Sequence, residues 1–135
     1  MEQGRRPSGN HWSSEGTPSH YRLKLWQQAV ALVSQVYALT SDLPAEERFG
    51  LVSQMRRSAI SVPSNIAEGA ARGSSQEMIR FLKIARGSLM ELDTQLAICE
   101  ELGLVHSPDS VFQPLRKLYG QINNLIGARE ARKAK

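Results

Sequence analysis

Six cationic side chains near the middle of the chain are of a type that can bind phosphate groups. They are Arg56, Arg57, Arg72, Arg80, Lys83 and Arg86. The last three follow one another at intervals of three residues, which on a helix gives a slightly drifting row. Phosphate contacts made by such a row do not depend on the nucleotide sequence of the nucleic acid, and salt weakens them. The alternative is that these cations form ion pairs, within or between subunits, with Glu68, Glu77 and Glu91.

Residues suited to catalysis or metal binding do not form a recognisable site. The histidines are His11, His20 and His106, and no two of them have the spacing of metal ligands. Cys99 lies on an apolar seam, where a buried thiol is expected rather than a nucleophile. The sequence has no glycine-rich phosphate loop and no zinc motif. We therefore expect no catalytic residue, no metal, no cofactor and no small-molecule substrate, and we predict that the protein is not an enzyme.

The segment from Pro63 to Gly69 places a proline inside an apolar helical pattern. The pattern continues on both sides of it, through Val52, Met55, Ala59, Val62 and Ile66. Proline inside a helix removes a backbone donor and clashes with the carbonyl four residues earlier, so we expect a kink at Pro63. In a structural interpretation, Ser64 or Asn65 satisfies the freed backbone groups and Gly69 allows close helix approach. In a functional interpretation, these residues and Glu68 form a contact patch.

Four amphipathic segments can position these residues. Apolar periodicity predicts helices over about 23–39, 45–70, 75–102 and 108–128, and no strand pattern competes with them. Gly73 and Gly103 suit helix C-termini, and Ser74 to Glu77 form a capping box that opens the third helix. Because short turns join neighbouring helices, the sequence predicts an all-α, antiparallel up-down-up-down four-helix bundle.

Length and charge indicate one folded domain with two polar ends. The 135 residues suit a single domain, and the formal net charge is only +4. Residues 1–20 are expected to be a disordered extension, 21–128 the bundle and 129–135 a basic tail. No secretory signal or membrane-spanning run is present and there is one cysteine, so we expect a cytoplasmic protein that does not contact membranes.

Two of the predicted helices carry more apolar residues than a single seam requires. Helix 23–39 has a wide apolar arc, and helix 75–102 has apolar residues on both flanks of its seam. Contiguous exposed apolar surface is rare on monomers, so we expect self-association. The alternative is that these residues merely lie at the boundary of the core. The candidate interface residues are Leu25, Trp26, Val30, Tyr37, Ile84, Met90 and Ile98.

Several segments together resemble a known family. They are Pro63-Ser64-Asn65-Ile66-Ala67-Glu68-Gly69 with Gln54-Met55-Arg56-Arg57 before it and Arg72 after it, Trp26-Gln27, Glu47-Arg48-Phe49-Gly50-Leu51, and the run from Arg80 to Leu92. They are similar to the four helix bundle protein family, which is encoded in intervening sequences of bacterial 23S rRNA genes. The resemblance covers about residues 21–126.

The resemblance implies properties that spacing alone does not show. Family members are four-helix bundles that assemble as ring-like homopentamers, and no enzymatic activity is attached to them. The family is also similar to the accessory variability protein of diversity-generating retroelements, which works with a reverse transcriptase and nucleic acid. We therefore expect a homopentameric scaffold or adaptor, with RNA or a further protein as candidate partners. The alternative is a nucleic-acid-binding accessory protein that uses the Arg/Lys row.

Overall fold

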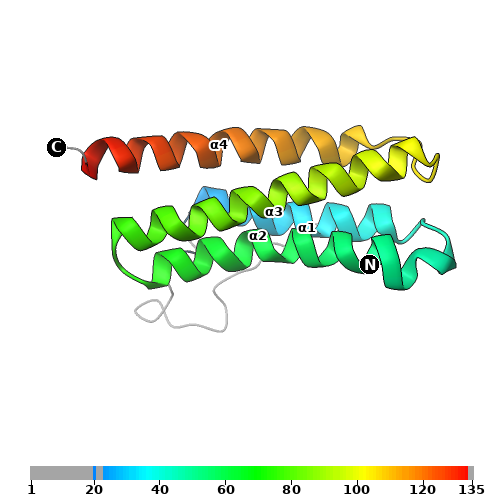
Figure 1. The fold of residues 1–135 in the computed structure, drawn as a ribbon, viewed down its shortest axis with the longest axis horizontal. Helices are drawn as coiled ribbons and strands as arrows, with labels where there is room; N and C mark the ends of the chain where they lie inside the picture. The colour runs from blue at the N-terminus through cyan, green and yellow to red at the C-terminus, as the bar shows by residue number, and fades with distance from the viewer. Residues whose placement is uncertain (1–19, 21–22, 134–135) are drawn as a thin grey trace.

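The structure, a computed structural model, describes residue 20 and residues 23–133, and this part of the chain is all-helical (Figure 1). The four α-helices are α1 (Lys24–Thr40), α2 (Ser53–Ala71), α3 (Ser75–Glu101) and α4 (Asp109–Lys133). Two short elements, η3 (Ala45–Glu47) and η4 (Arg48–Val52), precede α2. The predicted four-helix bundle is confirmed. The expected disordered extension lies outside the described residues, except for His20.

Side-chain contacts fix the relative direction of three of the helices. Ser61 of α2 bonds to Ser88 of α3, and Met55, earlier in α2, contacts Cys99, later in α3. Between α3 and α4, Asp93 bonds to Arg116 while Arg86 bonds to Asn123. In both pairs one residue number falls as the other rises, so α3 runs antiparallel to α2 and to α4 (Figure 1).

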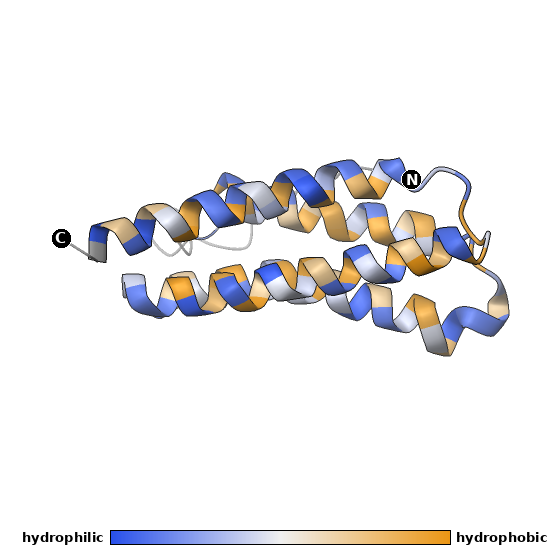
Figure 2. Cartoon of the chain, turned by 45° about the horizontal axis from the view of Figure 1, so that its top comes forward, coloured by the Kyte–Doolittle hydropathy of each residue, from blue (hydrophilic) through white to orange (hydrophobic). Residues whose placement is uncertain are grey.

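The core is built from the apolar seams that the periodicity predicts. Figure 2 shows hydrophobic residues recurring along each helix between hydrophilic ones, as amphipathic helices require. Burying one Leu or Ile side chain contributes roughly 1.5–3 kcal/mol before entropy is counted. The large side chains that are fully buried include Leu32, Met55, Ile66, Leu82, Leu89, Leu92, Leu96, Leu115, Leu118 and Ile122.

The predicted signals at the ends of α2 and α3 are confirmed. Gly73 has φ +80° and Gly103 has φ +69°, the left-handed conformation that glycine adopts without a side-chain clash. The Ser74 hydroxyl accepts a hydrogen bond of 3.1 Å from the backbone N–H of Glu77. A three-residue connection, 72–74, therefore turns the chain from α2 into α3 and places Arg72 beside the start of α3.

The segment predicted as one helix over 45–70 is divided. A 3₁₀ turn and a π-turn come first, Gly50 has non-helical angles (φ −108°, ψ −106°), and α2 begins only at Ser53. Glycine is a poor helix former, which agrees with a bend at Gly50, and Leu43 and Val52 on either side of the bend are both buried. Pro63 lies inside α2, which continues through it to Ala71. The kink at Pro63 stays a prediction.

The last helix is longer than predicted. Helix α4 continues through Lys133, so the expectation of a separate tail from residue 129 is wrong for residues 129–133. Arg129 bonds to Ser75 and Glu130 pairs with Lys83, which ties this turn to α3. These tertiary contacts stabilise a helical turn that the composition of residues 129–133 predicted to be part of a basic tail outside the helix.

Candidate functional site

The six cations proposed for phosphate binding do not gather on one face. Arg56 turns toward α1, where its Nε donates to Thr40 Oγ1 at 2.9 Å. Its guanidinium lies 4.2 Å from the centroid of the Tyr37 ring. Arg56 therefore lies away from the row on α3, because its side chain packs on α1, the opposite neighbour of α2.

Arg72 and Arg80 form a second group around Glu77 and Phe81. Their guanidinium nitrogens lie 3.9 Å and 3.5 Å from Glu77 Oε1, and Arg72 also pairs with Glu68 at 2.9 Å. Both guanidinium groups cover the Phe81 ring, at 5.3 Å and 5.0 Å from its centroid. Phe81 is buried. Its ring face is therefore covered and is not available to stack on a nucleic-acid base.

Of the three remaining cations, Lys83 and Arg86 contact α4, and Arg57 makes no contact of this kind with the described residues. Lys83 Nζ lies 3.3 Å from Glu130 Oε2, and Arg86 Nη1 donates to Asn123 Oδ1 at 3.0 Å. Arg57 is exposed and makes no such contact with the described residues. Exposed ion pairs contribute only about 0–1 kcal/mol each, so these pairs can exchange for phosphate contacts. Ion pairing within the subunit nevertheless accounts for Arg72, Arg80 and Lys83.

The polar residues after Pro63 connect α2 to α3. Asn65 Nδ2 donates to the Ser61 carbonyl at 2.8 Å and lies 2.9 Å from the Ser61 hydroxyl, which in turn lies 2.8 Å from the Ser88 hydroxyl. The Ser64 hydroxyl donates to the Ile60 carbonyl at 2.8 Å. The carbonyl that Pro63 leaves without its backbone donor is that of Ala59, and the bonds of Ser64 and Asn65 go to Ile60 and Ser61 instead. The network therefore ties α2 to α3 through Ser61 and Ser88 and does not satisfy the freed carbonyl.

Gly69 has the role that its position in the motif suggested. A Cβ atom placed on it would lie 2.9 Å from Phe81 Cβ and 3.0 Å from Met78 Sδ. Only a residue without a side chain fits between α2 and α3 at this level. The expectation that Gly69 permits close helix approach is confirmed.

Exposed apolar side chains lie on α1, α2, α3 and the segments that join them. Of the predicted interface residues, Tyr37, Ile84, Met90 and Ile98 are between 37% and 44% exposed. Leu25 and Val30 are half-buried. Trp26 is buried in the core of its own subunit, with the His20 ring 4.9 Å from its own, and so does not belong to the exposed set.

Sequence reasoning missed three exposed apolar residues. Phe49 is 89% exposed, Leu102 60% and Ile60 43%. Phe49 precedes the break at Gly50, and no apolar period marked it as exposed. Ile60 lies off the α2 seam, which is a signal that the sequence does contain.

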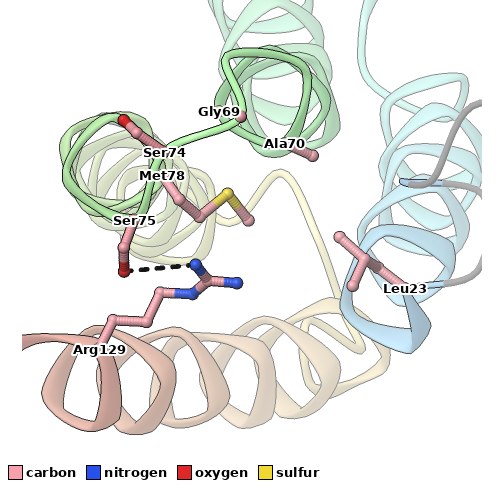
Figure 3. A pocket seen from close by; sticks show the side chains of 8 residues that line it. Leu23, Gly69, Ala70, Ser74, Ser75, Met78 and Arg129 are labelled. Carbon is pink, nitrogen blue, oxygen red and sulfur yellow. Dashed lines mark hydrogen bonds between the residues drawn. The ribbon is translucent and has the colours of Figure 1, made fainter. Parts of the chain in front are cut away.

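Sequence reasoning also missed a small pocket between α4 and the start of α3 (Figure 3). The pocket has a volume of about 240 Å³, and Gly69, Ser75, Met78 and Arg129 are among its lining residues. Arg129 Nη1 donates to Ser75 Oγ at 3.4 Å, while its Nε is buried without a hydrogen-bond partner in the described part of the chain. Because the sequence placed Arg129 in a tail, nothing pointed to a half-buried guanidinium there.

Two described side chains, Cys99 and His20, have pKa values that burial shifts. Burial raises the pKa of the Cys99 thiol, and repulsion from Glu47 raises it further, so the thiol stays protonated at neutral pH. Burial lowers the pKa of His20. Within residues 20 and 23–133, no three His, Cys, Asp or Glu side chains are placed to hold a metal ion. None of the helices in these ranges is long and apolar enough to cross a bilayer.

Comparison with known proteins identifies a family for this chain. No curated protein matches the chain. A family model described as "23S rRNA-intervening sequence protein" matches residues 21–128, which include every helix except the last turn of α4. The matched range contains the Pro63 to Gly69 motif, the cation row and the exposed apolar side chains described above. The chain therefore belongs to the 23S rRNA-intervening sequence protein family.

Proposed function

We propose that this protein is a non-enzymatic scaffold or adaptor that acts as a ring-like homopentamer. The observation that carries the proposal is the set of large apolar side chains left exposed by a subunit whose own core is complete. Contiguous exposed apolar surface is typical of interaction sites. Copies of one chain that meet through two different surfaces close into a ring when the rotation between them allows it.

The number five rests on the family resemblance. Ring-like homopentamers are what the resemblance implies, and membership of the family supports carrying that property to this chain. The likeness to the accessory variability protein of diversity-generating retroelements stays a prediction.

Size-exclusion chromatography with light scattering tests the assembly. We expect a mass five times the 15.0 kDa of one chain at micromolar concentration. A mass of one chain would overturn the scaffold proposal. A stable mass of another multiple would retain self-assembly and correct the number of subunits.

RNA association is a second candidate function, and one observation favours it. Arg57 is exposed and has no ion pair among the described residues, and the exposed side chains of Arg80 and Lys83 make surface ion pairs, which compete weakly with phosphate. Arg80 also lies over the Phe81 ring. The family description, which refers to 23S rRNA, agrees with such a partner. Binding through these residues would be independent of sequence.

Titration of labelled single- and double-stranded RNA at low and moderate salt tests this function. If the row binds phosphate, the double variant Arg80→Glu/Lys83→Glu binds more weakly than wild type and shows a smaller salt dependence. The matched control Lys24→Glu/Lys117→Glu makes the same charge change on α1 and α4. Equal weakening by both variants, or weak binding indistinguishable from wild type, would remove the cation row from the function.

A further inference from the structure

One end of the bundle carries an apolar groove between α1 and the start of α2. Its apolar side chains are the buried Val52 and the exposed Tyr37, Phe49 and Ile60, and its volume is about 480 Å³. Each of the three exposed side chains is at least 40% exposed. Phe49, next to the bend at Gly50, is 89% exposed and is therefore accessible to a second molecule.

The rim of this groove is positively charged. Arg48, Arg56 and Arg57 line it, and no carboxylate does. Arg56 is fixed over the Tyr37 ring, whereas Arg48 and Arg57 have no ion pair among the residues that the structure describes. The groove therefore suits a segment that carries apolar side chains together with unpaired acidic ones.

The chain itself carries such a segment on the outer side of α3. Ile84, Glu91, Ile98 and Leu102 follow at spacings of seven, seven and four, which places them along one line of the helix. Ile98 and Leu102 are 42% and 60% exposed. Neither Glu91 nor Glu101, which precedes Leu102, has an ion pair within the described ranges.

We propose that the groove of one copy binds the Ile98–Leu102 end of α3 from the next copy. The apolar side chains of that end pack on Tyr37, Phe49 and Ile60, while its acidic residues face Arg48 and Arg57. This inference rests on the proposed self-assembly and deepens it by naming the two surfaces that meet.

The position of the two surfaces in the fold favours a closed ring. The contact joins different surfaces of the two copies, so it is head-to-tail and not two-fold symmetric. Figure 1 shows the α1–α2 connection and the end of α3 at the same end of the bundle. Two surfaces at the same level are compatible with a rotation between neighbouring copies that has no rise along the bundle, and such a rotation closes a ring when it divides a full turn evenly.

Crosslinking between two different single variants tests this contact directly. Full-length Ile60→Cys chains and mass-tagged Ile98→Cys chains are refolded together and treated with a short bis-maleimide. We expect a crosslinked pair that contains one of each variant. Wild type controls for the buried Cys99, and Asn124→Cys, on exposed α4 surface, replaces Ile98→Cys as the matched control.

The outcomes separate this inference from the proposal it rests on. Crosslinks between two Ile60→Cys chains would show a two-fold contact and overturn the inference. No crosslink, in a protein that light scattering shows to be multimeric, would overturn it and leave self-assembly standing. A wild-type chain that is monomeric would overturn both.

Substitutions at the exposed side chains give an independent readout. Phe49→Glu and Leu102→Glu are each expected to lower the mass in solution to that of one 15.0 kDa chain. Asn124→Glu is expected to leave the mass unchanged. Circular dichroism checks that the variants fold, which we expect because both side chains are largely exposed. Wild-type mass in both Glu variants would contradict the proposed contact.

Discussion

At Gly69 the backbones of α2 and α3 approach too closely for any side chain. Gly69→Ala would place a methyl group within 3.0 Å of two side-chain atoms. Overpacking of this kind costs about 1–3 kcal/mol, which exceeds the roughly 1 kcal/mol that alanine gains over glycine in a helix. We expect the free energy of unfolding to fall by up to about 2 kcal/mol, measured by urea denaturation.

Gly87 provides the matched control for this substitution. It lies inside α3, and a Cβ atom placed on it would meet nothing within 4 Å. Gly87→Ala is therefore expected to raise the free energy of unfolding by about 0.5–1 kcal/mol. Effects of the same sign at both positions would show that packing does not decide the outcome at Gly69.

The Cys99 thiol is expected to be unreactive in the folded protein. It is fully buried next to Met55 Sδ, and burial raises its pKa, so both access and thiolate formation are reduced. Modification by a thiol reagent at neutral pH should be on the order of a hundredfold slower than in denaturant, because it requires opening of the bundle. The rate should rise with pH, since the thiolate is the reacting form. Rapid native labelling would contradict this burial.

At the level of elements, the start of α3 depends on its cap. The Ser74 hydroxyl satisfies one of the backbone N–H groups that have no partner in the first turn of a helix. Ser74→Ala is expected to lower the free energy of unfolding by about 1 kcal/mol, measured by thermal or urea denaturation. Ser74→Asp keeps an acceptor at this position and should preserve stability. Equal losses in both variants would show that the hydroxyl does not act as a cap.

Some features of the helices could be predicted from the sequence, and others could not. The Ser74 cap and Gly73 could be predicted because caps and left-handed turns depend on local chemistry. The division of segment 45–70 could not, since its apolar pattern is compatible with either a helix or a bend at Gly50. The last turn of α4 was missed for a related reason, because contacts of Arg129 and Glu130 with distant residues of α3 hold it.

At the level of the whole molecule, self-assembly should be visible in stability. Association that requires the folded chain raises apparent stability with concentration, by mass action. The midpoint of thermal unfolding is therefore expected to rise over about a hundredfold increase in wild-type concentration. Phe49→Glu, if it is monomeric, should unfold at a midpoint that does not depend on concentration. A wild-type midpoint that stays constant would argue against a folded assembly.

The sequence by itself determined the number of helices, most of their ends and the close approach at Gly69. It could do so because helical periodicity, capping and the size of a glycine are local properties of the chain. Only the tertiary structure decided that Arg56 faces α1, that Lys83 and Arg86 lean toward α4, and that Trp26 is buried while Phe49 is exposed. The direction and burial of each of these side chains depend on which neighbouring helix lies beside it, and a helical pattern does not contain that information.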